Sequence, residues 1–137
     1  MQQTSDLAFV VDRFMRRIHA GLHQQAVQVD TDRIGPFGGM ILMAVAEMEP
    51  VSIHALVAHM ARDKSQMTRS LRMLEERGLI ARAGCPEDGR VSLVSLTSKG
   101  RDLVAAFQRI LSEVLDGLMV PLGQAERAQL SALLRRL

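Results

Sequence analysis

The chain has 137 residues, 47% hydrophobic and 3% aromatic, and its 17 Lys and Arg against 15 Asp and Glu give a net charge of +2. This length fits one domain with an aliphatic core, and the apolar content excludes a disordered chain. The single cysteine, Cys85, excludes an intrachain disulfide framework. No apolar run approaches the ~20 residues of a membrane-spanning helix. Asp6 and Asp12 interrupt the apolar N-terminus, so we expect no secretory signal, a cytoplasmic location and no contact with a membrane.

A long first helix is predicted over residues 5–29, with Thr4 or Ser5 as its N-cap. Its apolar residues recur at three- and four-residue steps: Leu7, Val11, Phe14, Ile18 and Leu22. Pro36 and three glycines then break the pattern. Residues 40–48 are short, apolar and helix-prone, and Pro50 ends this second helix.

Two further helices follow in close succession. Ser52 is a predicted cap for a helix that runs through His59, and Asp63 caps the next one, where Asp63 and Gln66 have the spacing of a capping box. The apolar stripe of that helix is Met67, Leu71 and Leu74. At 100° per residue the opposite side carries Ser65, Arg69, Arg72 and Glu76, with Gln66 and Thr68 beside them. Gly78 is a natural residue to follow its C-terminus.

Two strands are expected at 79–84 and 91–96, joined by the turn PEDGR at 86–90. Thr97 caps a long helix that runs to about Met119. Pro121 and Gly123 interrupt it, and a last short helix places Leu130, Leu133 and Leu134 on one side. The order is four helices, a hairpin and two helices.

The predicted fold class is mainly α, a winged helix-turn-helix with a two-stranded β-wing. We expect one domain over 1–137, with the winged-helix core at 30–99 and terminal helices at 1–29 and 100–137. The terminal helices carry more apolar surface than a small core covers, which indicates a partner, most simply a second copy of the chain. The predicted dimerisation residues are Leu7, Val11, Phe14, Leu118, Leu130, Leu133 and Leu134.

Positive charge is concentrated in one segment. Between Arg62 and Arg82 there are six Arg or Lys and three Asp or Glu, an excess of +3, so the rest of the chain sums to −1. A local basic excess on a near-neutral chain favours a nucleic-acid surface, although a solvated helix face with ion pairs gives the same pattern.

The segment DKSQMTRSLRMLEERGLIAR followed by PEDGRVSLVSLTSKG resembles the MarR (multiple antibiotic resistance regulator) family of bacterial transcription factors. The matching features are the helix pattern, Arg82 in the next strand, and a wing reading D-x-R before L-T-x-x-G; they cover about residues 52–104. The resemblance implies a homodimer on a palindromic operator in double-stranded DNA, usually as a repressor that a small-molecule effector releases. Where the family wing commonly reads D-R-R, this chain has Gly89 between Asp88 and Arg90.

The predicted DNA-binding residues are Lys64, Ser65, Gln66, Thr68, Arg69, Arg72, Arg82, Asp88 and Arg90. The 63–77 helix is expected in the major groove, where Gln66 can pair with adenine and Arg69 with guanine or phosphate. Arg90 is expected to enter the minor groove. Asp88 is expected to face inward and pair with an arginine at the hairpin base or on the 63–77 helix, where the resemblance favours Arg82, and Gly89 is expected to let the backbone turn closely.

Four alternatives are weighed at this point. His19 and His23 share a helix face and could hold a metal, and Cys85 could act as a redox sensor, although we expect no metal site and no cofactor. A winged-helix module used only for protein contacts is disfavoured, because the outward side of the 63–77 helix has no aromatic or Leu anchor. An enzyme is not expected, since no catalytic or phosphate-loop motif is present.

Overall fold

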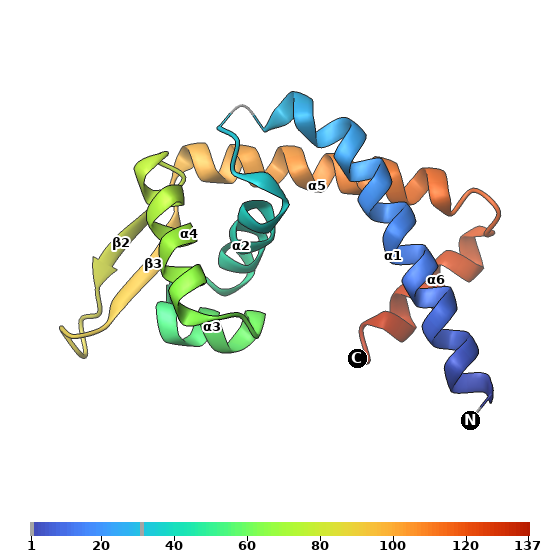
Figure 1. Ribbon diagram of the computed structural model, residues 1–137, viewed down its shortest axis with the longest axis horizontal. Coiled ribbons are helices and arrows are strands. Elements are labelled where there is room, and N and C mark those ends of the chain that lie inside the picture. Colours follow the sequence, from blue (N-terminus) through green and yellow to red (C-terminus); the bar gives the residue numbers. More distant parts are fainter. Residues whose placement is uncertain (1, 31) are drawn as a thin grey trace. The chain divides into compact units, whose positions relative to one another are not determined.

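The computed structural model of the chain describes residues 2–30 and 32–137, with the side chains of residues 6–30 and 32–137. Its elements in chain order are α1 (Gln2–Val29), α2 (Gly35–Met48), β1 (Val51–Ser52), α3 (Ile53–Met60), α4 (Lys64–Glu76), β2 (Ile80–Gly84), β3 (Ser92–Leu96), α5 (Ser98–Leu118) and α6 (Gln124–Leu134) (Figure 1). The predicted order of helices and hairpin is confirmed. Two compact units are present: unit one holds 1–27 and 108–137, and unit two holds 28–107.

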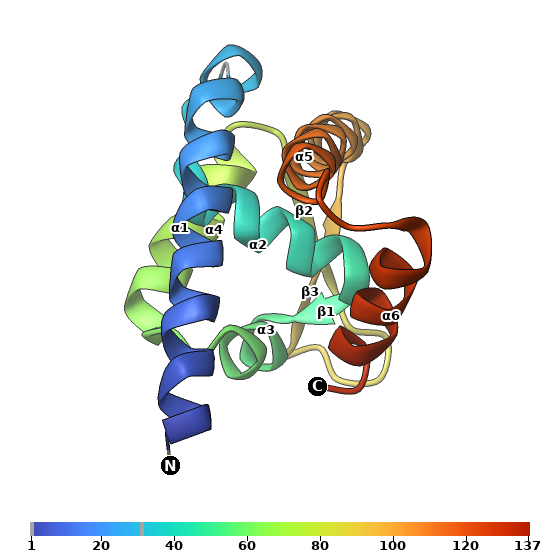
Figure 2. The same cartoon turned by 90° about the vertical axis from the view of Figure 1, so that its right-hand side faces the viewer.

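Unit two is a winged helix-turn-helix built on an aliphatic core. Its antiparallel sheet has the strand order β1-β3-β2, and α2, α3 and α4 pack against it (Figure 2). The fully buried side chains come from every layer, and they include Ile41, Leu42, Val45, Leu56, Met67, Leu71, Leu74, Leu79 and Val94. Because each of these helices presents one apolar stripe to the same core, their rotation about their own axes is fixed.

The predicted two-stranded wing, β2 paired with β3, is confirmed, and the sheet also contains a third strand, β1, that was not predicted. β1 pairs with β3 through Val51 opposite Val94 and Ser52 opposite Leu93. A strand of two residues is too short to show alternation, so the sequence carried no signal for it. Glu49 extends this edge, because its Oε2 accepts a hydrogen bond from the Leu96 amide at 2.9 Å.

The second helix begins earlier than predicted. α2 starts at Gly35 rather than at residue 40, with Pro36 in its first turn. Pro36 was interpreted as a break, yet a proline in the first helical turn gives up an N–H that has no partner there anyway. Asp30 supplies the acceptors for this helix start, since its two carboxylate oxygens accept from the amides of Ile34 and Gly35, each at 2.9 Å.

Helix caps explain most of the other boundaries. Ser52 Oγ accepts from the Ala55 amide at 3.1 Å and Thr97 Oγ1 from the Gly100 amide at 3.0 Å, so both predicted caps are confirmed. α1 begins at Gln2, three residues before the predicted start, and the side chains of Thr4 and Ser5 lie outside the described residues.

Unit one consists of α1, most of α5, and α6. Ile110 and Val114 are its buried apolar residues among those described. α1 and α5 approach closely at Gly21, where an added Cβ would come within 2.7 Å of Val114. Arg127 holds the turn between α5 and α6, since its guanidinium donates to the carbonyl oxygens of Met119 at 2.9 Å and Leu122 at 3.3 Å.

Candidate nucleic-acid interface

The outward face of α4 is set by the burial of its other face. Met67, Leu71 and Leu74 are fully buried, as predicted. Residues on the opposite side of the helix therefore point away from the core, and Ser65, Arg69 and Arg72 are exposed to solvent.

Both ends of α4 are held by backbone geometry. Asp63 is the N-cap, but its carboxylate accepts from the Ser65 amide at 2.8 Å rather than from Gln66, so the predicted capping box is wrong. At the C-terminus, Gly78 has a φ of 72°, and the Gly78 and Leu79 amides donate to the carbonyls of Glu75 and Leu74. This is the Schellman arrangement that a glycine after a helix favours.

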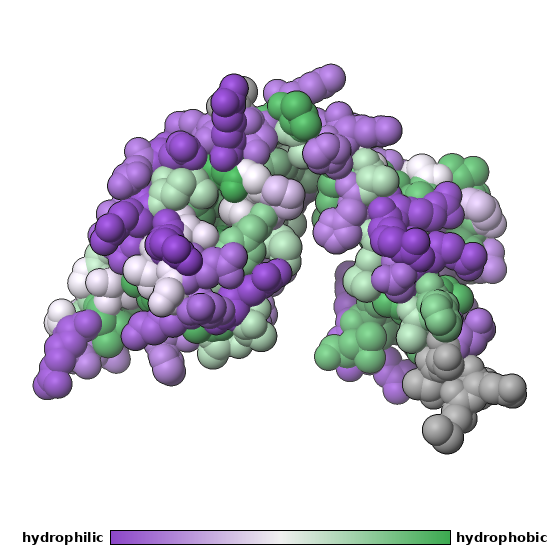
Figure 3. Space-filling model, in the orientation of Figure 1, coloured by the Kyte–Doolittle hydropathy of each residue, from purple (hydrophilic) through white to green (hydrophobic). Residues whose placement is uncertain are grey.

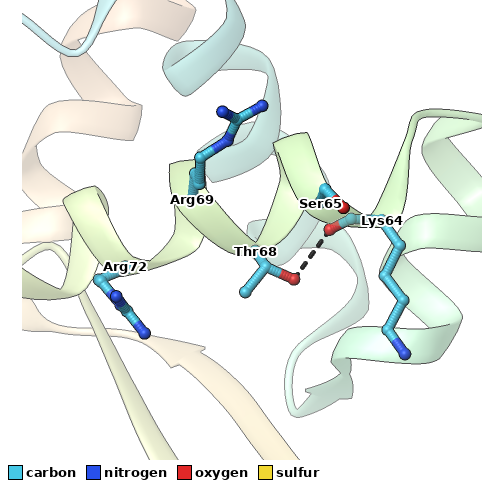
Figure 4. A pocket seen from close by; sticks show the side chains of 5 residues that line it. All are labelled: Lys64, Ser65, Thr68, Arg69 and Arg72. Atoms are coloured by element: carbon cyan, nitrogen blue, oxygen red, sulfur yellow. Dashed lines mark hydrogen bonds between the residues drawn. The ribbon is translucent and has the colours of Figure 1, made fainter.

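A shallow surface hollow runs along the outward face of α4, and it is lined by Lys64, Ser65, Thr68, Arg69 and Arg72 (Figure 4). Arg69 extends to one side of the helix, and Lys64 and Arg72 extend to the other. None of the five lining residues carries a negative charge. The carboxylate of nearby Asp63 does not line the hollow and accepts a hydrogen bond at the N-cap of α4. Thr68 Oγ1 donates to the Lys64 carbonyl at 2.8 Å. The hollow therefore presents three cations and two hydroxyls.

The structure thus gathers five of the nine predicted DNA-binding residues around one hollow. Gln66 is exposed on the same helix but does not line the hollow. Arg82, Asp88 and Arg90 belong to the hairpin. Arg62, which also counted toward the basic excess, stacks its guanidinium over the Phe37 ring at 4.9 Å from the ring centre.

The hairpin tip is organised by Asp88, although not in the predicted way. Asp88 Oδ1 accepts from the Arg90 amide at 3.0 Å, and its carbonyl accepts from the Val91 amide at 3.0 Å. Asp88 lies 4.0 Å from the Arg90 guanidinium and does not pair with Arg82, so that prediction is wrong. An aspartate that hydrogen-bonds the amide two residues on closes its own turn and needs no distant partner. The Arg90 side chain is 96% exposed.

Gly89 does not need the freedom of glycine. Its φ lies outside the left-handed region, and a Cβ at this position would meet open space. The predicted requirement for a close backbone turn at Gly89 is therefore wrong, and other residue types fit there.

Arg82 instead pairs with Glu75. Its Nε lies 2.5 Å from Glu75 Oε2, which links the middle of β2 to the last turn of α4. Sequence reasoning missed Glu75, because a helix residue and a strand residue seven positions apart have no fixed spacing that predicts contact.

The segment L-T-x-x-G joins α5 to the end of α4. Thr97 Oγ1 donates to the Gly78 carbonyl at 2.6 Å, and its amide donates to the Leu79 carbonyl at 3.1 Å. A Cβ at Gly100 would overlap that same Leu79 oxygen. Lys99 Nζ donates to the Arg77 carbonyl at 2.9 Å and to Asp32 at 3.2 Å. These contacts from the start of α5 fix the position of the C-terminal end of α4.

The residues of the sensing alternatives are far apart in the chain. His19 and His23 are exposed on α1. Cys85 is half-buried at the end of β2, where its amide donates to the Val91 carbonyl at 2.9 Å. Among the described residues, no group of three or more His, Cys, Asp or Glu side chains is placed to hold a metal ion.

The large exposed hydrophobic side chains are concentrated in unit one. Figure 3 shows one face of the molecule, on which hydrophobic residues (green) reach the surface among hydrophilic ones (purple). Ten of the eleven large exposed hydrophobic residues among the described side chains belong to unit one: Leu7, Phe9, Val10, Val11, Met15, Val27, Val120, Leu133, Leu134 and Leu137. Phe14, Leu118 and Leu130 are half-buried. The seven predicted dimerisation residues therefore all retain accessible surface.

The chain is similar in sequence to known regulators. The family model described as the MarR family matches residues 39–92. The uncharacterized HTH-type transcriptional regulator YxaD of Bacillus subtilis is 30% identical over 98 residues, which are 72% of this chain and 68% of that protein. The chain belongs to the MarR family. Another relative of this MarR-family chain, YdgJ of the same organism, is 31% identical over 75 residues, 55% of this chain, and the match spans 46% of YdgJ, about half its length.

Solved structures agree with the family fold. A mutant MarR from E. coli, complexed with operator DNA, superimposes with a TM-score of 0.76 at 20% identity over 98% of this chain and 94% of that one. BpsR of Bordetella bronchiseptica, whose DNA binding 6-hydroxynicotinic acid regulates, gives 0.71 at 24% identity over 96% and 97% of the two chains. The predicted winged helix-turn-helix is confirmed.

Family membership is in keeping with the expectation that this MarR-family chain is not an enzyme, because the family consists of transcriptional regulators. Within the described part of the chain, none of the helices combines the length and apolar character needed to cross a membrane.

Proposed function

We propose that this chain is a sequence-specific transcriptional regulator that inserts α4 into the major groove of double-stranded DNA. The observation that carries the proposal is the hollow along α4, whose lining offers three cations and two hydroxyls without a carboxylate. Phosphate contacts from Arg and Lys supply much of the affinity for DNA, and polar side chains at base edges supply the specificity.

The dimensions of α4 support this placement. An α-helix with its side chains is about 10–12 Å across, which fits the ~12 Å width of the major groove. Lys64 serves the phosphate backbone. Gln66 is suited to adenine, and Arg69 to guanine or phosphate.

The hairpin tip supplies the second contact. Arg90 is almost fully exposed and stands on a turn that Asp88 closes by its own hydrogen bonds. A narrow minor groove has an enhanced negative potential that attracts arginine, so the wing reaches the groove beside the one that α4 occupies. In this scheme Arg82 and Asp88 shape the wing rather than touch DNA.

The chain acts as a homodimer on a palindromic operator. The exposed apolar side chains of α1 and α6 support this, because patches of this kind mark protein interfaces and two-fold dimers are the commonest assembly. Two copies of α4 related by a two-fold axis read two half-sites about one helical turn apart.

The dimer represses transcription in the bacterial cytoplasm, where its DNA lies, and a small-molecule effector releases it. The ligand-regulated DNA binding of BpsR supports the second point. A promoter-reporter assay distinguishes repression from activation. If reporter expression rises when the protein is expressed, the protein is an activator and the proposal of repression is contradicted.

Selection of bound sequences from random duplex DNA tests the proposal. The expected result is an enriched palindrome. Simultaneous replacement of Lys64, Arg69 and Arg72 by alanine should abolish the enrichment while the thermal unfolding temperature stays close to that of the parent, because these side chains are exposed. A parent chain that enriches no sequence contradicts the proposal.

A further inference from the structure

The ion pair between Glu75 and Arg82 connects the two parts of unit two that the proposed function uses. Glu75 lies in the last turn of α4, and Arg82 lies at the middle of β2, opposite Val94 of β3. The Arg82 side chain is 28% exposed and that of Glu75 is 46% exposed. Arg82 follows Ile80 on the same face of the strand, and Ile80 is buried in the core beneath α4. The pair therefore continues the contact between α4 and β2 outward from the core toward the wing.

The position of Glu75 is unfavourable for its charge. A carboxylate in the last turn of a helix opposes the helix dipole. It also adds negative charge to the helix that we place against phosphates. Among the described residues Glu75 and Arg82 form ion pairs only with each other. Both the helix dipole and the nearby phosphates disfavour a negative charge at this position. We therefore attribute the presence of Glu75 to the geometry that its ion pair with Arg82 imposes.

We propose that Glu75 is a positioning residue for DNA binding: through Arg82 it fixes the wing relative to α4, so that Arg90 and the α4 hollow engage adjacent grooves together. The inference rests on the proposed function. Beyond Gly84, the hydrogen bonds of the wing tip among the described residues stay within the hairpin: Asp88 accepts from the Arg90 and Val91 amides, and the Val91 carbonyl accepts from the Cys85 amide. Among the described residues, the contact between Arg82 and Glu75 is the ion pair that joins the hairpin strand β2 to α4.

The inference and simple electrostatics predict opposite signs for Glu75→Gln. Loss of one negative charge beside DNA raises affinity if charge alone matters. If Glu75 positions the wing, its loss lowers operator affinity by about 1.4-fold to fivefold, the range for a partly exposed ion pair. Glu76→Gln is the matched control, because it removes the same charge one residue later from a side chain that has no ion pair among the described residues. Glu76→Gln should bind as tightly as the parent or slightly more tightly.

Two further variants separate positioning from a direct contact. The double variant Glu75→Arg with Arg82→Glu reverses the pair and keeps the net charge, so it should recover most of the affinity that either single change loses. A direct contact of Arg82 with phosphate would leave the reversed pair as weak as Arg82→Glu alone. In the Arg90→Ala background, Glu75→Gln should have little further effect, because the wing contact that it positions is already gone. Additive losses in that cycle would overturn the inference.

Amide hydrogen exchange of the DNA-free protein supplies a readout that does not depend on DNA. Glu75→Gln should speed exchange at the Val91 and Cys85 amides, which close the hairpin, while Glu76→Gln leaves them unchanged. Unchanged exchange in Glu75→Gln overturns the inference whether or not the parent binds DNA. A parent that binds no duplex overturns the proposed function, and the exchange result then still decides whether Glu75 holds the wing.

Discussion

At the scale of single residues, position 89 in the wing could carry a charged side chain, because the backbone geometry there does not require glycine. The position accepts a side chain, because its φ is not left-handed and an added Cβ meets open space. It also stands next to Arg90, the most exposed cation of the wing. Compared with a wing that reads D-R-R, glycine at position 89 removes one positive charge, and the conformation of the turn does not require it.

We therefore expect Gly89→Arg to raise DNA affinity roughly threefold to tenfold at about 0.1 M salt, since one added phosphate contact steepens the log–log salt slope by about 0.9. Fluorescence anisotropy on duplex DNA at several salt concentrations measures both quantities. Gly117→Arg is the control, because Gly117 is also exposed with open space at its Cβ, but it lies in unit one. An equal gain from both variants would show that net charge, and not wing contact, is responsible.

Most residue-level predictions from sequence succeeded where the partner is local, although the local capping box between Asp63 and Gln66 did not. The apolar stripe of α4 and the caps at Ser52, Asp63 and Thr97 follow from spacings of two to seven residues. The Asp88–Arg82 pair failed because a long-range partner depends on how β2 packs against α4, and no spacing encodes that. Glu75 was missed for the same reason.

At the scale of elements, the α4–β2–α5 junction decides how α4 is held. Thr97 and Lys99 donate to the carbonyls at the end of α4, and Gly100 lies against the Leu79 carbonyl. Only a residue without a side chain allows α5 to approach β2 this closely.

Gly100→Ala should therefore lower the free energy of unfolding by about 1–3 kcal/mol, as overpacking does. Gly117→Ala, in the same helix with open space, should raise it by up to about 1 kcal/mol, because alanine favours helix. Urea unfolding at one fixed protein concentration gives both values. If the two variants prove equally stable, the close approach at Gly100 is not a constraint on the fold.

The boundaries of helices and strands were predicted from the sequence less accurately than the order of the elements. Both α1 and α2 begin earlier than predicted, at Gln2 and Gly35. For α2 the reason is Pro36, because a proline is as compatible with the first turn of a helix as with a break before it. β1 escaped prediction because two residues form a strand only when β3 lies beside them. Its pairing is a product of tertiary packing.

At the scale of the whole molecule, the apolar surface of unit one predicts a dimer. Light scattering at micromolar concentration should report twice the chain's 15.1 kDa. Leu133→Glu should shift the protein toward monomer and weaken operator binding, because a charge at a buried interface is costly. Met40→Glu is the control: Met40 is equally exposed at 50%, against 49% for Leu133, and it lies in unit two. A dimer that survives Leu133→Glu would place the interface elsewhere.

The most direct test of the central claim, that the outward face of α4 reads base sequence, is selection from random duplex DNA by the parent, Gln66→Ala and Lys64→Ala in parallel. Both side chains are exposed, so neither change should disturb the fold. We predict that Gln66→Ala loses its preference at one symmetric pair of positions, worth about 1–3 kcal/mol there, while Lys64→Ala selects the parent sequence with lower affinity and a flatter salt dependence. If both variants select the parent sequence and lose affinity uniformly, α4 does not read bases through Gln66 and the account is contradicted.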